Sequence, residues 1–272
     1  MTLIALLTDF GLRDTYVGQM KLVIAGIAPD ARVIDLGHGV EPQQVAEGAW
    51  LLETAMPYLP EGAIVVAVVD PGVGTERRPV AVRCAGRIFI GPDNGLLSGA
   101  LPSELRRAAV PGGSPVVVPP AVEARVIDVS RFALSEVSAT FHGRDVFAPA
   151  AAHLARGTAF ESLGPTAEEL VLLPPFEAAQ LPGGRLRGEV VHVDRYGNLI
   201  TTVRASQLPS RFRARVAGSD PIEFARTFAD VARGEALCHV DSSGYLAVAV
   251  REGSAAERFR AGIGTPVEVE AT

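Results

Sequence analysis

Three side chains of the kinds that can activate water stand in the first half of the sequence. Asp70 opens a loop of sequence DPGVGTER, Arg77 closes that loop, and His142 lies much further along the chain. A carboxylate, a guanidinium and an imidazole that converge on one pocket can orient a water molecule and stabilise its hydroxide form. Taken singly, the Gly72-x-Gly74 pattern is typical of a tight turn and the histidine of a structural donor. The chemistry therefore depends on their convergence.

Other acidic residues lie in or near predicted loops, at Asp9, Asp93 and Asp145. Together with Asp70 and His142 they could form the oxygen-rich kind of site that suits a hard cation. A metal hydrolase is therefore one alternative, although the spacing matches no recognised ligand motif and Arg77 would compete for the same carboxylates. The glycine-rich loop has neither the Lys-Ser/Thr of a P-loop nor the third glycine of the dinucleotide fingerprint, so phosphate binding is not indicated.

The elements that must position these side chains alternate in the first half of the chain. Apolar runs at residues 3–7, 33–36 and 63–69 predict strands, and the last, AIVVAVV, is typical of a strand buried on both faces of a parallel sheet. Two helical stretches lie between them, the second over residues 45–59. This order predicts a layered α/β domain with a mostly parallel central sheet, in which ligands bind at the carboxyl ends of the strands.

Shorter elements complete the first half. Strands are expected at residues 79–84 and 87–90, and a helix at about 145–155 that Asp145 could cap. Residues 174–184 concentrate proline and glycine without periodicity, which predicts a linker. We therefore expect a first domain of residues 1–175.

The second half changes to short strands without intervening helices. They are expected at residues 188–193, 199–203, 213–216, 237–240, 245–250 and 267–269. Such strands predict a smaller antiparallel β-barrel-like domain, here residues 185–272. The polar segments 194–198 (DRYGN) and 241–245 (DSSGY) predict hairpin turns, because glycine and asparagine adopt positive φ. On local pattern, Phe228 is simply a buried aromatic.

The composition is that of a globular protein with a large core. Of the 272 residues, 48% are hydrophobic and 21% charged, and the net charge of −6 gives no reason to expect a nucleic-acid partner. No run reaches the roughly 18 apolar residues that span a bilayer, so no membrane association is expected, and residues 1–7 look like a first strand instead of a signal peptide. Cys84 and Cys238 are expected to be small buried hydrophobes of a reducing compartment, which predicts a cytoplasmic protein.

Five motifs, in order, span nearly the whole chain. They are TDFG at 8–11, DPGVGT-x-R at 70–77, GPDNG at 91–95, FHGRDVFAP at 141–149 and D-R-YGN at 194–198. This set resembles the S-adenosylmethionine (SAM) hydrolases, or SAM hydroxide adenosyltransferases, which are related to the SAM-dependent fluorinase and chlorinase. The resemblance implies an α/β domain followed by a β-barrel-like domain. It also implies a homotrimer with active sites between the first domain of one subunit and the second domain of its neighbour.

The resemblance further implies the reaction and the residues. The reaction is in-line attack of an activated water or hydroxide on the ribose C5′ of SAM, giving adenosine and methionine without a metal or organic cofactor. Asp70, Arg77 and His142 match the water-activating triad, and Asp9 matches the residue that holds the ribose hydroxyls. The remaining matched positions are in the second domain: Tyr196, Asn198 and Phe228 for the adenine pocket, Asp194 and Ser242 for the methionine group, and the backbone of Ser254 and Ala255 for the adenine edge.

Two other activities remain open beside hydrolysis. A SAM-dependent halogenase would share the substrate, but a carboxylate at Asp70 would repel a halide, and Gly143 stands where the fluorinase has a serine hydroxyl. The halogenase relatives also have an arginine at the position of Ser243, so the methionine carboxylate would need other contacts. A module that binds SAM or adenosine without turnover would keep the pocket but would not need Asp70, Arg77 and His142 together.

Overall fold

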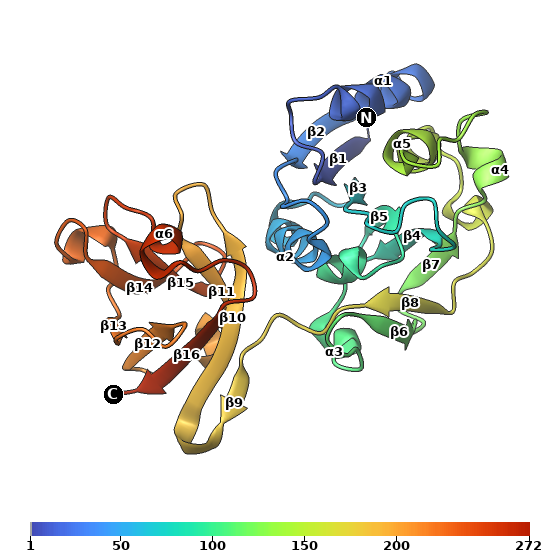
Figure 1. Ribbon diagram of the computed structural model, residues 1–272. Coiled ribbons are helices and arrows are strands. Elements are labelled where there is room, and N and C mark those ends of the chain that lie inside the picture. Colours follow the sequence, from blue (N-terminus) through green and yellow to red (C-terminus); the bar gives the residue numbers. More distant parts are fainter. Residues whose placement is uncertain (1) are drawn as a thin grey trace. The chain divides into compact units, whose positions relative to one another are not determined.

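The computed structural model describes residues 2–272, which form two compact units that divide between Pro175 and Phe176 (Figure 1). Each unit has its own hydrophobic core.

A six-stranded sheet forms the centre of the first unit. Its strands are β1 (Leu3–Thr8), β2 (Arg32–Gly37), β3 (Ile64–Val68), β4 (Pro79–Cys84), β5 (Arg87–Pro92) and β7 (Glu123–Val126). They lie in the order β2-β1-β3-β5-β4-β7. The first four strands are parallel, β4 is antiparallel to both of its neighbours, β5 and β7, and β7 therefore runs in the direction of the first four. The predicted α/β class with a mostly parallel sheet is confirmed.

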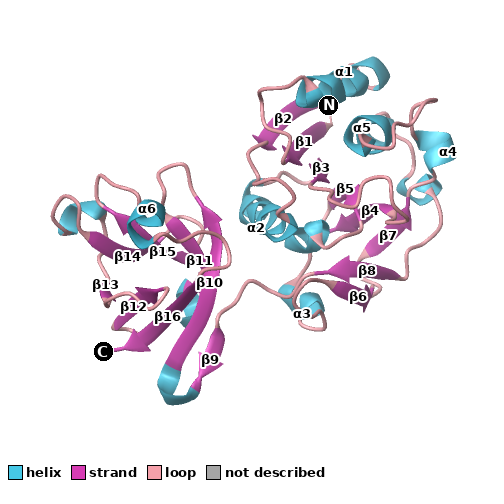
Figure 2. Cartoon of the chain, viewed as in Figure 1, coloured by secondary structure: helices cyan, strands magenta, loops and turns pink. Residues whose placement is uncertain are grey.

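Helices cover both faces of this sheet. Helices α1 (Tyr16–Ile27) and α5 (Ala148–Ala155) cover one face, while α2 (Val45–Ala55) and the short helix η2 (Leu96–Ala100) cover the other (Figure 2). Strand β1 sends Ile4 and Leu6 into the core under α1 and α5, and its alternate residues into the opposite core. Strand β3 does the same, because its side chains alternate between the faces and all are apolar. The continuous β-branched run thus has the predicted place.

Smaller elements complete the first unit: η1 (Met56–Tyr58), α3 (Ser103–Arg106), β6 (Ser114–Val117), α4 (Val129–Phe132), η3 (Gly143–Phe147), η4 (Phe160–Leu163) and β8 (Glu169–Leu172). Strands β6 and β8 pair in a separate two-stranded sheet. Element η3 is a π-helical turn that leads directly into α5.

The prediction that Asp145 caps a helix is wrong. Asp145 lies inside η3 and is fully buried. Its carboxylate accepts a hydrogen bond from the backbone N–H of Ser138 at 2.8 Å and pairs with Arg144 at 2.6 Å. The helix begins before residue 145, so the carboxylate ties the preceding loop to the helix instead of satisfying a free helix end.

The second unit is an antiparallel sheet of eight strands. They are β9 (Ala179–Leu181), β10 (Arg185–Val193), β11 (Leu199–Arg204), β12 (Phe212–Val216), β13 (Ile222–Glu223), β14 (Ala236–Val240), β15 (Tyr245–Val250) and β16 (Pro266–Ala271). The order is β13-β12-β16-β10-β11-β15-β14, with β9 added beside β10. Just after β13, Ala225 N–H donates to the carbonyl of Cys238 in β14 at 2.9 Å, which nearly closes the sheet into the expected barrel shape. Short helices η5 (Pro182–Gly184), η6 (Ala205–Gln207), η7 (Phe228–Asp230) and α6 (Ala255–Phe259) join the strands.

The proline- and glycine-rich segment 174–184 is more ordered than the linker expected there. Strand β9 pairs with β10 across a turn in which Gly183 and Gly184 adopt φ of 79° and 73°. The two units divide between Pro175 and Phe176, inside this segment, and residues 179–184 form the first strand and the turn of a hairpin, because glycine supplies the positive φ of the turn.

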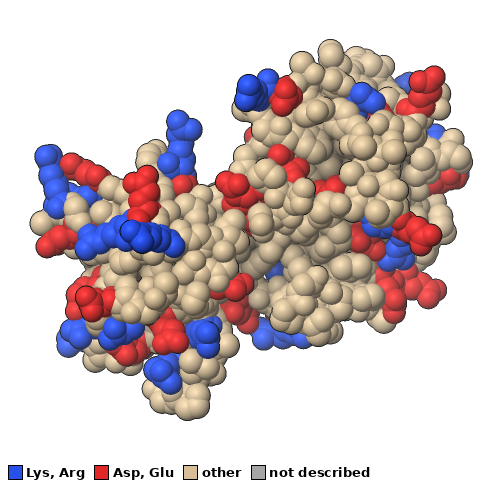
Figure 3. Space-filling model, viewed as in Figure 1, with Lys and Arg blue, Asp and Glu red and all other residues tan. Residues whose placement is uncertain are grey.

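Two expectations from composition can be compared with the structure. Cys84 and Cys238 are buried free thiols, as predicted. Residues 2–272 contain no helix that is long and apolar enough to cross a membrane. On the face drawn in Figure 3, positive and negative side chains are interspersed.

Candidate active site

Arg77 joins Asp70 and His142 into one contact group. Its Nε lies 3.0 Å from each carboxylate oxygen of Asp70, and its Nη2 lies 2.5 Å from Oδ2. The same Nη2 lies 2.6 Å from Nδ1 of His142. The side chains of Arg77 and Asp70 are only 10% and 5% exposed, so little water screens the pair. The structure therefore brings together the three residues whose convergence the sequence left open.

The loop that carries Asp70 and Arg77 is fixed by local hydrogen bonds and by one glycine. Asp70 follows β3, and Thr75 Oγ1 donates to the carbonyl of Gly72 at 2.7 Å. Gly74 adopts φ of +78°, and a Cβ atom there would lie 2.6 Å from the carbonyl oxygen of Ala139. Only glycine permits this approach, which brings the loop against the segment leading to His142.

The contact with Arg77 sets the protonation of His142. A guanidinium has only donors, so Nδ1 of His142 must accept, and the proton of the neutral ring is then on Nε2. Burial lowers the pKa of His142, and the charge of Arg77 lowers it further, while Asp70 and Asp145 act in the opposite sense. The imidazole is therefore neutral near pH 7 and presents an N–H at Nε2.

The pKa of Asp9 is raised by burial and by the nearby charge of Asp70. The backbone N–H of Gln43 opposes the rise by donating to Oδ2 at 2.9 Å. Asp9 follows β1 and Asp70 follows the neighbouring parallel strand β3. Both carboxylates thus lie at the carboxyl edge of the sheet, where open α/β sheets bind ligands.

Gly143 leaves no room for a side chain. A Cβ atom there would lie 3.0 and 3.2 Å from two ring atoms of Phe10 and 3.4 Å from Sδ of Met20. The Phe10 ring also packs edge-on against Phe141, with centroids 5.7 Å apart. The space beside His142 that a larger residue at 143 would need is filled by the Phe10 ring.

Three of the four carboxylates of the metal-site alternative pair with arginines. Asp93 pairs with Arg78 at 2.5 Å and accepts from the N–H of Val171 at 2.8 Å. Asp145 pairs with Arg144, as described above, and Asp70 pairs with Arg77. Among residues 2–272, no group of three or more His, Cys, Asp or Glu side chains is placed to hold a metal ion. Asp70, Asp93 and Asp145 thus each have a cation for a partner, whereas Asp9 accepts from the backbone N–H of Gln43.

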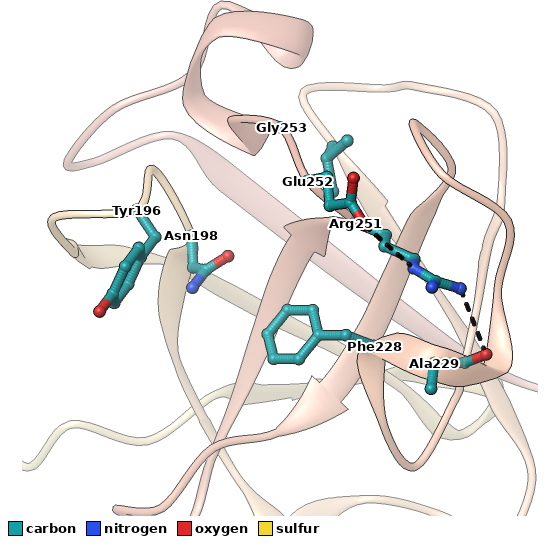
Figure 4. Close-up of a pocket in the computed structure, with 8 residues that line it drawn as sticks. Tyr196, Asn198, Phe228, Ala229, Arg251, Glu252 and Gly253 are labelled. Atoms are coloured by element: carbon teal, nitrogen blue, oxygen red, sulfur yellow. Dashed lines mark hydrogen bonds and ion pairs between the residues drawn. The ribbon is translucent and has the colours of Figure 1, made fainter.

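The second unit contains a separate, mostly apolar pocket of about 590 Å³ (Figure 4). Three of its residues, Tyr196, Asn198 and Phe228, were predicted for an adenine pocket. The structure adds five that the sequence analysis missed: Ala229, Val250, Arg251, Glu252 and Gly253. A usable signal was present, because Ser254-x-x-Glu257 has the form of a capping box and marks the preceding residues as a loop before a helix.

Asn198 is held in one orientation within this pocket. Its Nδ2 donates to Oδ2 of Asp194 at 2.7 Å, and a carboxylate can only accept, so the amide nitrogen and oxygen are assigned without ambiguity. The oxygen points away from the Tyr196 ring (Figure 4). Phe228 and Tyr196 are 43% and 76% exposed. A planar ligand with an amino group could stack on the exposed rings and donate to the Asn198 oxygen.

The other predicted contacts of the second unit lie elsewhere. Asp194 uses its carboxylate within its own turn, accepting from the N–H groups of Tyr196 and Asn198 at 2.8 and 2.9 Å. Ser242 belongs to the turn before β15, whereas Asp194 belongs to the turn before β11. Because these strands are antiparallel, the two turns lie at opposite ends of the strand pair. The structure does not bring Asp194 and Ser242 together within the unit.

Ser254 and Ala255 do not line the pocket. Ser254 caps α6, and its Oγ accepts from the N–H of Glu257 at 3.1 Å. Ala255 is fully buried within the second unit. The preceding Gly253 lines the pocket in their place.

Two family models match the two units. The N-terminal domain of the SAM hydroxide adenosyltransferases matches residues 4–164, and the C-terminal domain matches residues 188–268. The chain belongs to the SAM hydroxide adenosyltransferase family. It is 42% identical over 248 residues to the (R)-S-adenosyl-L-methionine hydrolase of Thermus thermophilus, covering 86% of each chain. It is also 42% identical over 240 residues to the enzyme of that name from Salinispora tropica, covering 87% of this chain and 85% of the relative.

The fluorinases are more distant family relatives. The fluorinase of Actinopolyspora mzabensis is 31% identical over 234 residues, which cover 76% of this chain and 73% of the fluorinase. Among solved structures, an uncharacterized conserved protein from Thermotoga maritima superimposes with a TM-score of 0.84 at 33% identity, covering 98% of this chain and 99% of that one. A conserved hypothetical protein from Thermus thermophilus superimposes with a TM-score of 0.75 at 41% identity, covering 99% and 100%.

Proposed function

We propose that this protein hydrolyses SAM to adenosine and methionine by attack of an activated water on the ribose C5′. The observation that carries the proposal is the contact of one guanidinium, Arg77, with both Asp70 and His142. The similarity to enzymes named (R)-SAM hydrolase supports it and points to the (R)-sulfonium as the substrate. The sulfonium leaves as neutral methionine, so the protein needs to supply only an oriented and activated oxygen nucleophile.

The hydrogen-bond directions assign the proton. Arg77 is protonated and has no acceptor. His142 uses Nδ1 to accept from Arg77 and carries its own proton on Nε2, so it can donate to the oxygen of water but cannot take its proton in this form. Asp70 is the remaining group, and its carboxylate has lone pairs beyond those engaged by Arg77. We therefore assign the base to Asp70 and the orientation of water to His142.

The charge of Arg77 favours hydroxide over water in this buried place. One O–H bond of water breaks and the proton goes to Asp70. A C5′–O bond then forms as the C5′–S bond breaks, and the bonding electrons leave with the methionine sulfur. A dry site favours this approach of an anion to a cation.

Each unit would bind a different part of the substrate. Asp9 would accept the two ribose hydroxyls, and the pocket of Tyr196, Asn198 and Phe228 would hold adenine. Asp194, Ser242, Ser254 and Ala255 remain predictions from the family resemblance alone. The same resemblance supports a homotrimer in which neighbouring subunits complete each site.

Three further proposals concern the setting of the reaction. No cofactor is required, because the sulfonium itself provides the leaving group. SAM and adenosine are the proposed small-molecule partners, and neither a nucleic acid nor a membrane has a role in the reaction. The two free thiols, Cys84 and Cys238, support a reducing and therefore cytoplasmic location.

The first experiment is chromatography of the purified protein incubated with each sulfonium epimer of SAM in ¹⁸O-labelled water. We expect equal amounts of adenosine and methionine, with the label in adenosine alone, since the new bond is C5′–O. Turnover should persist with a chelator and with chloride, and should be lost in Asp70→Ala.

Other outcomes would replace the proposal. Formation of 5′-chloro-5′-deoxyadenosine in chloride would identify a halogenase. Loss of turnover with a chelator would identify a metal hydrolase, and binding of SAM without any product would identify a non-catalytic module.

A further inference from the structure

His38 holds both ends of the turn that carries Asp9. Its carbonyl oxygen accepts the N–H of Gly11 at 2.7 Å, and its Nδ1 lies 2.8 Å from Oγ1 of Thr8. Thr8 is the last residue of β1, and Gly11 adopts φ of +65°. Asp9 therefore lies in a four-residue turn that is tied at its start and its end to the same residue.

The side chain of His38 links Asp35 to Thr8 in a series of polar contacts. Nε2 lies 3.0 Å from Oδ1 of Asp35, poorly aligned for a hydrogen bond but close enough for an electrostatic contact. Asp35 also accepts from Nζ of Lys21 at 2.8 Å. Because a carboxylate only accepts, the tautomer that suits Asp35 has its proton on Nε2, and in that tautomer Nδ1 accepts from the Thr8 hydroxyl. Oγ1 of Thr8 in turn accepts the backbone N–H of Phe10 at 3.2 Å.

The hydrogen bond between His38 and Thr8 is buried. Thr8 is fully buried and His38 is 5% exposed, so a polar group left without a partner there would be costly. The parallel pairing of β1 with β2 sets Leu7 opposite Gly37 after a register shift, which places His38 beside Thr8. The position of His38 next to the turn is therefore set by the pairing of β1 with β2.

We propose that His38 and Thr8 are positioning residues that fix the Asp9 carboxylate for binding a vicinal diol, the ribose of the substrate. The inference rests on the proposed function for the identity of the ligand. The pinning of the turn is independent of any ligand. The two parts can be tested separately.

The first test measures amide hydrogen exchange in the whole protein. Thr8→Val removes the hydroxyl and keeps the shape, so the amides of Phe10 and Gly11 should exchange at least about ten-fold faster, as expected for the loss of roughly 1.4 kcal/mol. Thr54→Val is the matched control, because its hydroxyl donates to the carbonyl of Leu51 within α2, and it should leave the turn unchanged. Unchanged exchange at Phe10 in Thr8→Val would overturn the inference.

The second test compares the binding of adenosine with that of 2′,3′-dideoxyadenosine by calorimetry. Thr8→Val should weaken the binding of adenosine about ten-fold and leave the binding of 2′,3′-dideoxyadenosine nearly unchanged, since the dideoxy compound has no diol to donate to Asp9. With SAM, KM should rise while kcat changes little, because ground state and transition state use the diol equally. Equal losses for both nucleosides would show a general disturbance and overturn the role in diol binding.

Two substitutions of His38 separate hydrogen bonding from packing. Asparagine can place an oxygen near the position of Nδ1, whereas glutamine matches the volume better and reaches the position of Nε2. The proposal expects His38→Asn to retain tighter adenosine binding than His38→Gln, and the reverse order would show that volume alone matters. If the wild type binds neither nucleoside, the proposed function fails, and the exchange data still decide whether His38 and Thr8 pin the turn.

Discussion

Gly74 approaches Ala139 so closely that a Cβ atom at position 74 would lie 2.6 Å from the carbonyl oxygen of Ala139. This contact joins the loop of Arg77 to the segment that precedes His142. The hydrogen bond between Nη2 of Arg77 and Nδ1 of His142 therefore depends on a position that takes no part in the chemistry.

Gly74→Ala should lower both stability and activity. The positive φ costs about 1 kcal/mol for a residue with a Cβ atom, and the displaced Ala139 backbone adds to it. Gly112→Ala is the control, because φ is +86° there but nothing lies within 4 Å of the added atom. Urea unfolding should show a larger loss for Gly74→Ala, and only this variant should lose kcat. Equal losses at the two positions would contradict the role of the contact.

Asp70→Asn should abolish most turnover while SAM still binds. Removing a proton acceptor typically costs 10²- to 10⁴-fold in rate, so kcat should fall by roughly that factor. Asp93→Asn is the matched control for Asp70→Asn, since the side chains of Asp70 and Asp93 are 5% and 4% exposed and each pairs with an arginine. It should reduce stability and leave kcat of the folded protein within about two-fold. Single-turnover kinetics beside calorimetric SAM binding would measure both effects.

His142 should titrate below its ordinary pKa of 6.5, because burial and then Arg77 disfavour its charged form. Above that value the ring is neutral in both folded and unfolded chains. As pH falls below 6.5, His142 of the unfolded chain binds a proton before His142 of the folded chain does. The free energy of unfolding therefore decreases with falling pH, until the pH is below the lowered pKa of the folded state. Urea unfolding from pH 7 to 5 should fall less steeply for His142→Asn than for wild type. A steeper fall in the variant would reverse the assigned sign.

Asp9→Asn should stabilise the protein near pH 7 and weaken substrate binding. Burial and Asp70 raise the pKa of Asp9, so its ionised form disfavours folding once pH has risen through the folded pKa. An amide removes that charge, and its oxygen can still accept from Gln43. Thermal unfolding should give a higher Tm, while KM for SAM should rise about ten-fold or more, the loss of a charged hydrogen bond. A lower Tm would show that the carboxylate is needed for the fold.

Phe228→Ala should raise KM for SAM with kcat little changed. Stacking of a base on an aromatic ring contributes about 1–3 kcal/mol, so the rise should be roughly five-fold to a hundred-fold. Phe224→Ala is the control, since Phe224 is 45% exposed against 43% for Phe228 and does not line the pocket. Equal effects of the two changes on KM would show that the pocket is not the adenine site.

The family motifs point to the proposed reacting groups but not to their neighbours in space. Asp145 stands in the same motif as His142, and Asp93 stands in the GPDNG motif, yet they pair with Arg144 and Arg78 and hold loops in place. No pattern of neighbouring residues separates such a carboxylate from Asp70. The difference lies in which arginine each one meets, and in whether a ligand can reach the pair.

The sequence by itself determined the properties that depend on near neighbours. The continuous apolar and β-branched run of residues 63–69 predicts a strand with two buried faces, and the glycines of segments 194–198 and 241–245 allow the positive φ of tight turns. Tertiary structure decided what depends on distant residues meeting: the contact of Arg77 with His142, the Phe10 ring against Gly143, and the pocket wall at residues 250–253. These contacts arise where the ends of separate strands and loops come together, and that juxtaposition is set by the pairing of whole strands and the packing of the core.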